Sequence, residues 1–378
     1  REVERANLCR LYLLLGRARL AVRAGSRDAE DALQRAHALA PEESLRAQVE
    51  LYRARGLLSR GQLGAARKLL ERARTRLDEQ TPELRALISM ELGTLFWYAG
   101  EFLESEARFE EALDGAQAGG WNRIKARALA GRGVLHLCRG RLSTAEKDLR
   151  GAIEAYALLG DRASLWQSQS NLADILRRKG CFSESIALLE EEMEAVREAG
   201  TWIRQALFVL NMAETEVELH RLGRARERIE GLRGDMSVQE HIHMRASVAF
   251  VQARIAIVSS EPVLAIDILE PVVEDCRKAE IHIVTAQLQA LLGEVRVKTG
   301  DVEVGMEVLS KAIQSLQEQG HMPSLGEACA ARARAMGDRE DPDLSFGPVL
   351  HWMNEEPIRV LKLEYLVASA KYAEGMNK

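Results

Sequence analysis

The sequence predicts an all-α solenoid of about nine helical hairpins plus a terminal helix, and two observations support this prediction. The first is composition. The 378 residues are 47% hydrophobic and 29% charged, include only 8 Pro, and are rich in Ala, Leu, Glu and Arg, which have high helix propensity. The second is a repeat. At intervals of about forty residues, a turn residue follows one small residue by seven positions and precedes another by five.

Seven units share this repeat. The turn residues are Gly61, Gly100, Gly140, Gly180, His220, Ser260 and Gly300. The small residues seven positions earlier are Ala54, Gly93, Gly133, Ala173, Ala213, Ala253 and Gly293. The small residues five positions later are Ala66, Ser105, Ala145, Ser185, Ala225, Ala265 and Gly305. A fixed period of this length is typical of stacked units that contact only their neighbours.

Each unit is predicted to contain two helices. In the most regular unit, residues 122–139 form the first helix, Gly140 breaks it, and residues 141–158 form the second. Apolar residues of the second helix recur at spacings of three and four and line one face. Nine positions after the turn, every unit has a large apolar residue: Leu70, Phe109, Leu149, Leu189, Ile229, Leu269 and Leu309. We expect these side chains to fill the space between hairpins.

The small residues and the turn glycines have a common physical explanation. A small residue late in the first helix lets the second helix cross it closely, and the small residue after the turn removes a side chain where the two helices meet. Glycine at the turn permits the positive φ that a tight connection between helices requires. The pattern therefore predicts closely packed helical hairpins rather than isolated helices.

The array is expected to extend over residues 1–378, with departures at both ends. Residues 1–40 form a degenerate first unit, residues 42–318 form seven regular units, and residues 321–378 form an atypical last unit. In that last unit, 338–346 is the most loop-like stretch, and 356–373 is a helix that either caps the array or begins an incomplete unit. Second turns, between units, are expected at Gly119–Gly120, Gly160, Gly200, Gly234 and Gly320. Because the first residue is Arg1 rather than Met, we expect a segment of a longer protein.

The repeat resembles the tetratricopeptide repeat (TPR). In unit 82–118 the pattern reads Leu92-Gly93, Phe96, Gly100, Phe102, Ser105, Phe109 and Ala112, and in unit 122–158 it reads Gly133, Gly140, Leu142, Ala145, Leu149 and Ala152. The resemblance implies a right-handed α-α superhelix whose first helices line a concave groove for partners. The units are about six residues longer than the 34-residue repeat and lack its closing Pro. In this they resemble the arrays of bacterial signal-transduction regulators linked to an ATPase or a kinase, and also those of kinesin light chains.

Charge and cysteine usage narrow the function classes. The net charge is −5, with acidic and basic residues interleaved, so direct nucleic-acid binding is not expected. The five cysteines are scattered without a paired spacing, which favours a reducing compartment and a cytoplasmic protein. No apolar run is long enough to span a membrane, so no membrane partner is expected.

Asparagine occurs at the same position in two neighbouring units, as Asn171 and Asn211. An amide can both donate and accept, so a ladder of such residues can hold the backbone of an extended peptide without reading its sequence. The alternative is that each asparagine only bonds to a neighbouring helix. By the same register, further groove positions are Gln167, Ser170, Asp174, Arg177, Arg178, Arg127, Met90, Trp97 and Tyr98. Trp97, Tyr98 and the arginines are types that often dominate binding energy, although the two aromatic rings could instead pack between helices.

Other site chemistries find little support. His241 and His243 lie two positions apart and would face different directions on a helix, so no metal site is expected. No phosphate-binding glycine loop is present, and we expect neither a cofactor nor an enzyme activity.

We therefore expect an interaction scaffold or sensor that binds a peptide or protein segment in its concave groove, as part of a larger cytoplasmic signalling protein. Two alternatives remain open. One is a small-molecule effector domain of a transcriptional regulator, which a deep pocket would favour. The other is a self-association module that forms a homodimer.

Overall fold

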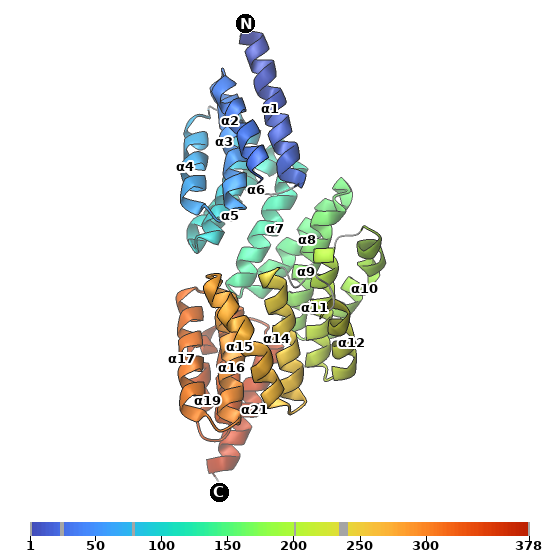
Figure 1. Ribbon diagram of the computed structural model, residues 1–378, viewed down its shortest axis with the longest axis vertical. Coiled ribbons are helices and arrows are strands. Elements are labelled where there is room, and N and C mark those ends of the chain that lie inside the picture. Colours follow the sequence, from blue (N-terminus) through green and yellow to red (C-terminus); the bar gives the residue numbers. More distant parts are fainter. Residues whose placement is uncertain (1, 23–25, 78–79, 200–201, 234–240, 377–378) are drawn as a thin grey trace. The chain divides into compact units, whose positions relative to one another are not determined.

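The computed structural model describes residues 2–22, 26–77, 80–199, 202–233 and 241–376, and these residues form helices joined by short turns, with no β-strand among them. By its internal contacts the chain divides into two compact units. The first unit comprises Arg1–Leu135 and Gly151–Asp161, and the second comprises His136–Arg150 and Arg162–Lys378. Figure 1 shows the helices of each unit in chain order. One continuous array over residues 1–378 stays a prediction.

The first unit begins with three helical hairpins. Its helices are α1 (Glu2–Val22), α2 (Arg27–Leu39), α3 (Glu43–Leu58), α4 (Leu63–Thr75), α5 (Pro82–Tyr98) and α6 (Phe102–Gly119). The first helix of each of these hairpins packs against the second. Two further helices have residues in both units: α7 (Asn122–Cys138) and α8 (Leu142–Leu159).

The second unit continues the pattern. Its hairpins are formed by α9 (Arg162–Arg178), α10 (Phe182–Glu198), α11 (Trp202–Glu218), α12 (Leu222–Arg233), α14 (Ile242–Val258), α15 (Pro262–Lys278), α16 (His282–Lys298) and α17 (Val302–Glu318). The C-terminal part contains α18 (Met322–Met336), α19 (Pro342–Phe346), the 3₁₀ helix η1 (Gly347–Val349), α20 (Leu350–Glu355) and α21 (Arg359–Met376). The expectation of a loop over 338–346 is wrong in its second half. Pro342 starts a short helix there, and the Asp341 side chain caps it by accepting from Asp343 N.

The predicted turn residues adopt the expected backbone conformation. The five turn glycines have φ between +72° and +100°, and His220 and Ser260 take the same left-handed conformation with φ of 54° and 60°. The turns between units at Gly120, Gly160 and Gly320 also have positive φ. Gly200 and Gly234, expected as two more such turns, lie outside the described residues. The turn geometry is therefore set by the register of the repeat, even where the residue is not glycine.

The small residues lie where the two helices of a hairpin cross. A Cβ added to Gly293 of α16 would lie 2.7 Å from the carbonyl oxygen of Gly305 in α17. Where serine replaces the second small residue, its hydroxyl is used: Ser105 Oγ donates to the carbonyl oxygen of Gly93 at 2.8 Å. Ser185 makes the same bond to Ala173, also at 2.8 Å. The seven large apolar residues nine positions after the turn are all buried, as predicted.

Candidate functional site

Within the second unit, the first helices of the hairpins lie next to one another in a closed inner ring. Helices α9, α11, α14, α16 and α18 are in contact in that order, and α21 packs against both α18 and α9. We call these six helices the inner ring. The C-terminal segment helps to close it at Trp352 of α20, whose Nε1 donates to the carbonyl oxygen of Gly140 at 2.9 Å. The expected terminal helix thus completes a ring instead of only covering one end.

The forty-residue period places one row of side chains inside this ring. The first helices of five successive hairpins each contribute one residue to the same cavity, and these residues are separated by forty positions: Gln167, Leu207, Ser247, Gln287 and Glu327. The cavity, here called the amide cavity, has a volume of about 240 Å³. Because successive repeats stack in the same way, side chains at equivalent positions of the repeat form a row in space.

Most predicted groove residues of the second unit meet in the amide cavity. Six of them line it: Gln167, Ser170, Asn171, Asp174, Arg178 and Asn211. Arg177 lies deeper, with its side chain only 4% exposed, and lines the adjoining cavity. That these residues bind a partner stays a prediction.

The two asparagines differ in their surroundings. Asn211 Nδ2 donates to both the carbonyl oxygen and Oγ of Ser170, each at 2.8 Å, so its amide nitrogen links α11 to α9. Asn171 lies one forty-residue repeat earlier and is half-buried at the cavity wall. Its side chain makes no hydrogen bond to another described residue. The Asn211 amide nitrogen therefore bonds to a neighbouring helix, which is the alternative considered above. The Asn171 amide has no such bond and can still bond a ligand.

Buried arginines hold the inner ring together. Arg177 of α9 pairs with Asp174 at 2.6 Å, with Glu214 at 3.1 Å and with Glu218 at 3.4 Å. Arg178 pairs with Asp174 at 2.9 Å and with Glu327 of α18 at 2.8 Å. The pair between Arg178 and Glu327 therefore joins two helices of the ring that are far apart in sequence.

The pKa values of the carboxyl groups reflect this arrangement. Burial would raise the pKa of Asp174, but Arg178 and Arg177 outweigh it and hold the pKa at about 2. Arg254 and Arg177 likewise outweigh the effect of burial at Glu218, whose pKa is also about 2. Glu214 behaves differently. Its burial and the nearby carboxylates of Asp174 and Glu327 raise its pKa despite Arg177.

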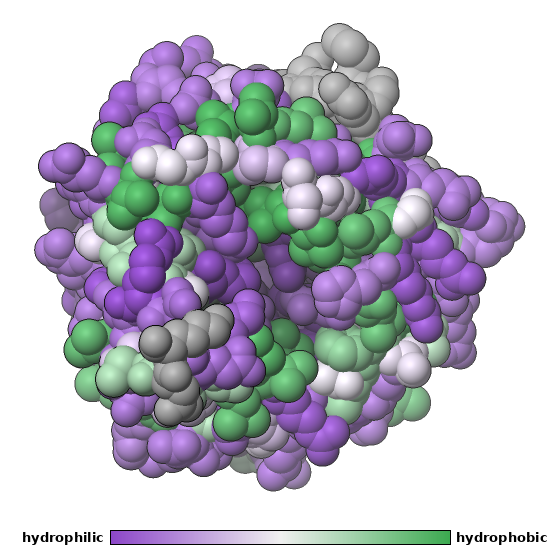
Figure 2. All heavy atoms as spheres, turned by 90° about the horizontal axis from the view of Figure 1, so that it is seen from below, coloured by the Kyte–Doolittle hydropathy of each residue, from purple (hydrophilic) through white to green (hydrophobic). Residues whose placement is uncertain are grey.

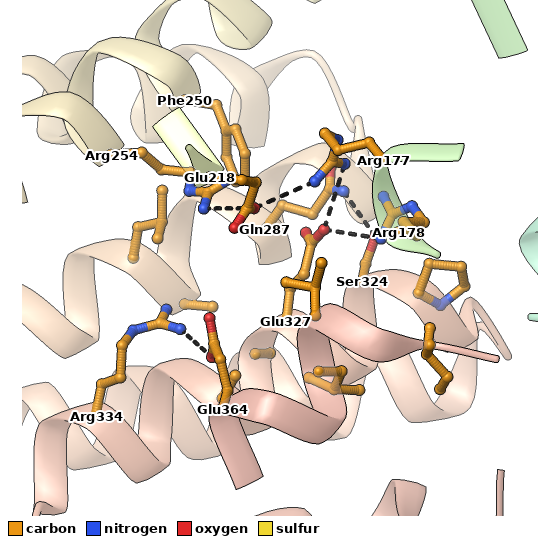
Figure 3. A pocket seen from close by; sticks show the side chains of 18 of the residues that line it. Arg177, Arg178, Glu218, Phe250, Arg254, Gln287, Ser324, Glu327, Arg334 and Glu364 are labelled. Atoms are coloured by element: carbon orange, nitrogen blue, oxygen red, sulfur yellow. Dashed lines mark hydrogen bonds and ion pairs between the residues drawn. The ribbon is translucent and has the colours of Figure 1, made fainter. Parts of the chain in front are cut away.

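A second cavity, the arginine neck, adjoins the amide cavity. It shares Arg178, Phe250, Gln287 and Glu327 with the amide cavity and is lined by the paired side chains shown in Figure 3. In the neck Arg254 bonds Glu218 at 2.9 Å, and Arg334 of α18 pairs with Glu364 of α21. Arg334 also bonds Glu294 of α16 at 2.8 Å. The charges of the neck are therefore largely compensated by the protein itself.

A third cavity, the apolar trench, continues from the neck. It lies between α21 and the inner faces of α14 and α16, and has a volume of about 460 Å³. Its apolar lining includes Ile257, Val258, Leu291, Val360, Leu363 and Val367. Figure 2 shows a hollow on the lower face of the molecule that is bordered by both hydrophobic and hydrophilic residues. The neck shares lining residues with both the amide cavity and the trench, so the three cavities adjoin one another in the order amide cavity, neck, trench.

The groove residues predicted in the first unit have other surroundings. Met90 is 1% exposed and packs with Phe109 and Leu135, so its prediction as a surface contact is wrong. It faces the hairpin core because α5 is apolar on nearly all sides. Trp97 is half-buried against the same cluster, and its ring lies 4.7 Å from that of Tyr98. Tyr98 is 57% exposed. Arg127 donates to Glu91 at 2.7 Å.

Several residues of the inner ring were not predicted from sequence. They are Glu214, Glu218, Phe250, Arg254, Gln287, Glu327, Arg334 and Glu364. A signal for three of them was present: Glu214, Arg254 and Arg334 belong to a row spaced by forty residues that starts at Asp174 and includes Glu294. Glu364 lies outside the repeat, and nothing in its sequence context indicates that α21 folds back onto the ring.

Two further observations concern site chemistry. Among the described residues, no three His, Cys, Asp or Glu side chains are grouped so that they could bind a metal ion. His241 packs against Trp202, with ring centroids 5.0 Å apart. No helix in the described ranges combines the length and apolar character that a membrane span requires.

Comparison with solved structures identifies the architecture. A Rap protein complexed with Competence and Sporulation Factor superposes with a TM-score of 0.70 at 13% identity, covering 98% of this chain and 99% of that one. NprR in complex with its cognate peptide NprX gives a TM-score of 0.62 at 13% identity, covering 92% and 98%. The fold is that of a TPR-like helical array. At such low identity the likeness establishes the fold of the TPR-like array and nothing finer.

A third solved structure is similar to part of the chain. It is a Signal Transduction ATPase with Numerous Domains from Pyrococcus horikoshii, a protein with a tetratricopeptide repeat sensor. The TM-score is 0.55 at 15% identity, and the match covers 78% of this chain and 44% of that one. No protein-family model matches the TPR-like array, and no curated protein matches its sequence.

Proposed function

We propose that the second unit binds an extended peptide inside the inner ring and serves as a sensor or scaffold module of a larger signalling protein. The observation that carries this proposal is the amide cavity, where Asn171, Gln167 and Gln287 come together from helices α9 and α16. Amide side chains complement the alternating N–H and C=O groups of a peptide backbone. Binding of this kind requires shape and hydrogen bonding but no catalytic chemistry.

The solved structures support the proposal by analogy. The Rap protein is complexed with Competence and Sporulation Factor, and NprR is bound to its cognate peptide NprX. Both cover nearly the whole of this chain with the same helical arrangement. Peptide recognition is thus compatible with this fold. The choice of the residues that would bind the peptide rests on the amide cavity alone.

A synthetic library of acetylated and amidated heptapeptides provides the test, because capped peptides carry no terminal charges. The full chain is immobilised, retained peptides are sequenced, and their Kd values are measured for wild type, Asn171→Ala and Asn354→Ala. Loss of hydrogen bonds to a peptide backbone is expected to weaken binding by about tenfold in Asn171→Ala. Asn354 is exposed on α20 and outside the amide cavity, so its variant is the control. Failure to retain any peptide, or equal affinity for all three proteins, contradicts the proposal.

A small-molecule effector is the second candidate, and closure of the inner ring favours it. A ring closed by α21 surrounds its cavities on more sides than an open groove does, and small ligands favour concave sites that bury most of their surface. The same three proteins are therefore heated with a mixture of soluble metabolites. A thermal shift with metabolites and none with peptides selects this candidate over the peptide.

A further inference from the structure

The apolar trench has one wall that the fold does not require to be apolar. Helix α21 presents Val360, Leu363 and Val367 to the trench at spacings of three and four, so they lie on one helical face. Ile257 and Val258 of α14, together with Leu291 of α16, line the same trench. Leu363 is 62% exposed and Val367 is 46% exposed, so a large part of each side chain is left uncovered by the protein.

Helix α21 is held in place by a different set of residues. Leu361 of α21 and Ile358 just before the helix are buried, and neither lines the trench. Leu361 packs so closely on Gly326 of α18 that a Cβ there would lie 2.7 Å from it. Tyr365 contacts Phe346 of α19 edge-on, with ring centroids 5.4 Å apart. The packing of α21 therefore does not depend on Leu363 or Val367, which remain available to a ligand.

The trench adjoins the arginine neck, which in turn adjoins the amide cavity. It shares seven lining residues with the arginine neck: Glu218, Arg254, Leu291, Ala330, Arg334, Val360 and Glu364. In the neck, Arg254 and Arg334 already have carboxylate partners. A ligand that passes through the neck therefore needs no charge of its own to compensate them.

From this sequence of surfaces we infer the class of ligand, on the basis of the function proposed above: an uncharged peptide in which a polar segment adjoins a run of aliphatic side chains. The polar segment lies in the amide cavity at Asn171, and the aliphatic side chains lie in the apolar trench against Leu363 and Val367. Burial of two or three aliphatic side chains is expected to strengthen binding by at least about tenfold.

Three pools of capped synthetic hexapeptides test this inference on the full chain. The first pool has three polar positions (Ser, Thr, Asn, Gln) followed by three aliphatic positions (Leu, Ile, Val). The second has the reverse order, and the third has six polar positions. The proteins are wild type, the double variant Leu363→Gln plus Val367→Gln, and the control Leu366→Gln. Leu366 is on the same helix and 61% exposed, but it does not line the trench.

We expect wild type and Leu366→Gln to retain at least one mixed pool about tenfold more tightly than the polar pool. The double variant should lose that preference while keeping its affinity for the polar pool. Equal retention of all pools by wild type, or unchanged preference in the double variant, overturns the inference and leaves the proposed function standing. Retention of no pool by wild type overturns both.

Discussion

Buried charges are arranged differently in the two units. In the first, Glu91 of α5 accepts from Arg55 of α3 at 2.6 Å and from Arg127 of α7 at 2.7 Å, so one acid links consecutive hairpins. In the second, Arg177 is the central charge, and its partners lie on α9, α11 and α18. The same device, an ion pair between first helices, joins neighbours in one unit and ties together a ring in the other.

This difference determines what happens when one partner is lost. Glu91 keeps one arginine if the other is removed. Among the described residues, by contrast, the only ion pair of Glu214 is with Arg177. A buried carboxylate left without its cation is costly, whereas one that keeps a second partner is much less so. The stability of the ring should therefore be more sensitive to single substitutions than that of the first unit. There, ion pairs join consecutive hairpins in a row, here called the ladder.

The largest expected effect is that of Arg177→Met, which should lower the free energy of unfolding of the second unit by about 3–5 kcal/mol. Arg55→Met should cost only about 1 kcal/mol, because Arg127 still compensates Glu91. Urea unfolding followed by circular dichroism measures both. Lys311→Met, which removes an exposed pair with Glu307, is the control and should change little. Equal losses for the two arginine variants would contradict the contrast between ring and ladder.

Two glycines with the same backbone conformation test ring closure. Gly140 and Gly100 both have φ of +75°, so alanine causes similar backbone strain at each. A Cβ on Gly140 would clash with Trp352 Nε1, whereas no atom lies within 4 Å of one on Gly100. Gly140→Ala should therefore destabilise the protein by about 1–3 kcal/mol more than Gly100→Ala. Thermal unfolding of the two variants measures the difference, and identical values would show that the contact with Trp352 adds nothing.

The change in the free energy of unfolding between neutral and acid pH gives a third test. The pKa of Asp174 is about 2 in the folded protein and 3.8 ordinarily, so its ionisation stabilises the fold above pH 4, and this stability is lost as pH falls towards 2. Asp174→Asn should cost on the order of 2 kcal/mol at pH 7, and the difference from wild type should shrink towards zero near pH 2. Urea titrations at several pH values follow this change. In Glu307→Gln, whose pair with Lys311 is exposed, stability should differ little from wild type at any pH.

Much of the fold could be predicted from sequence because the repeat acts locally. Small residues such as Gly293 and Gly305, and the turn residues, determine each hairpin through contacts within a few turns of helix. The row at Asn171 could be placed for the same reason. The burial of Met90 could not be predicted, because α5 has apolar residues on nearly all of its faces. The register of the repeat alone does not say which of these faces is buried. The packing of α21 against α9 could not be predicted either. It depends on contacts of Arg359 and Trp352 with glycines about two hundred residues earlier in the chain.

The smallest effect separates the two asparagines that the repeat makes equivalent. Asn211→Ala removes two hydrogen bonds to Ser170 and should lower the free energy of unfolding by about 1 kcal/mol. Asn171→Ala removes no hydrogen bond within the described structure and should leave stability within about 0.5 kcal/mol of wild type. In peptide affinity the order should reverse, with Asn171→Ala the weaker binder. Urea unfolding and peptide titration of the same two proteins settle both points. If Asn171→Ala proves the less stable of the pair, its amide serves the fold, and the amide cavity loses its main ligand-binding group.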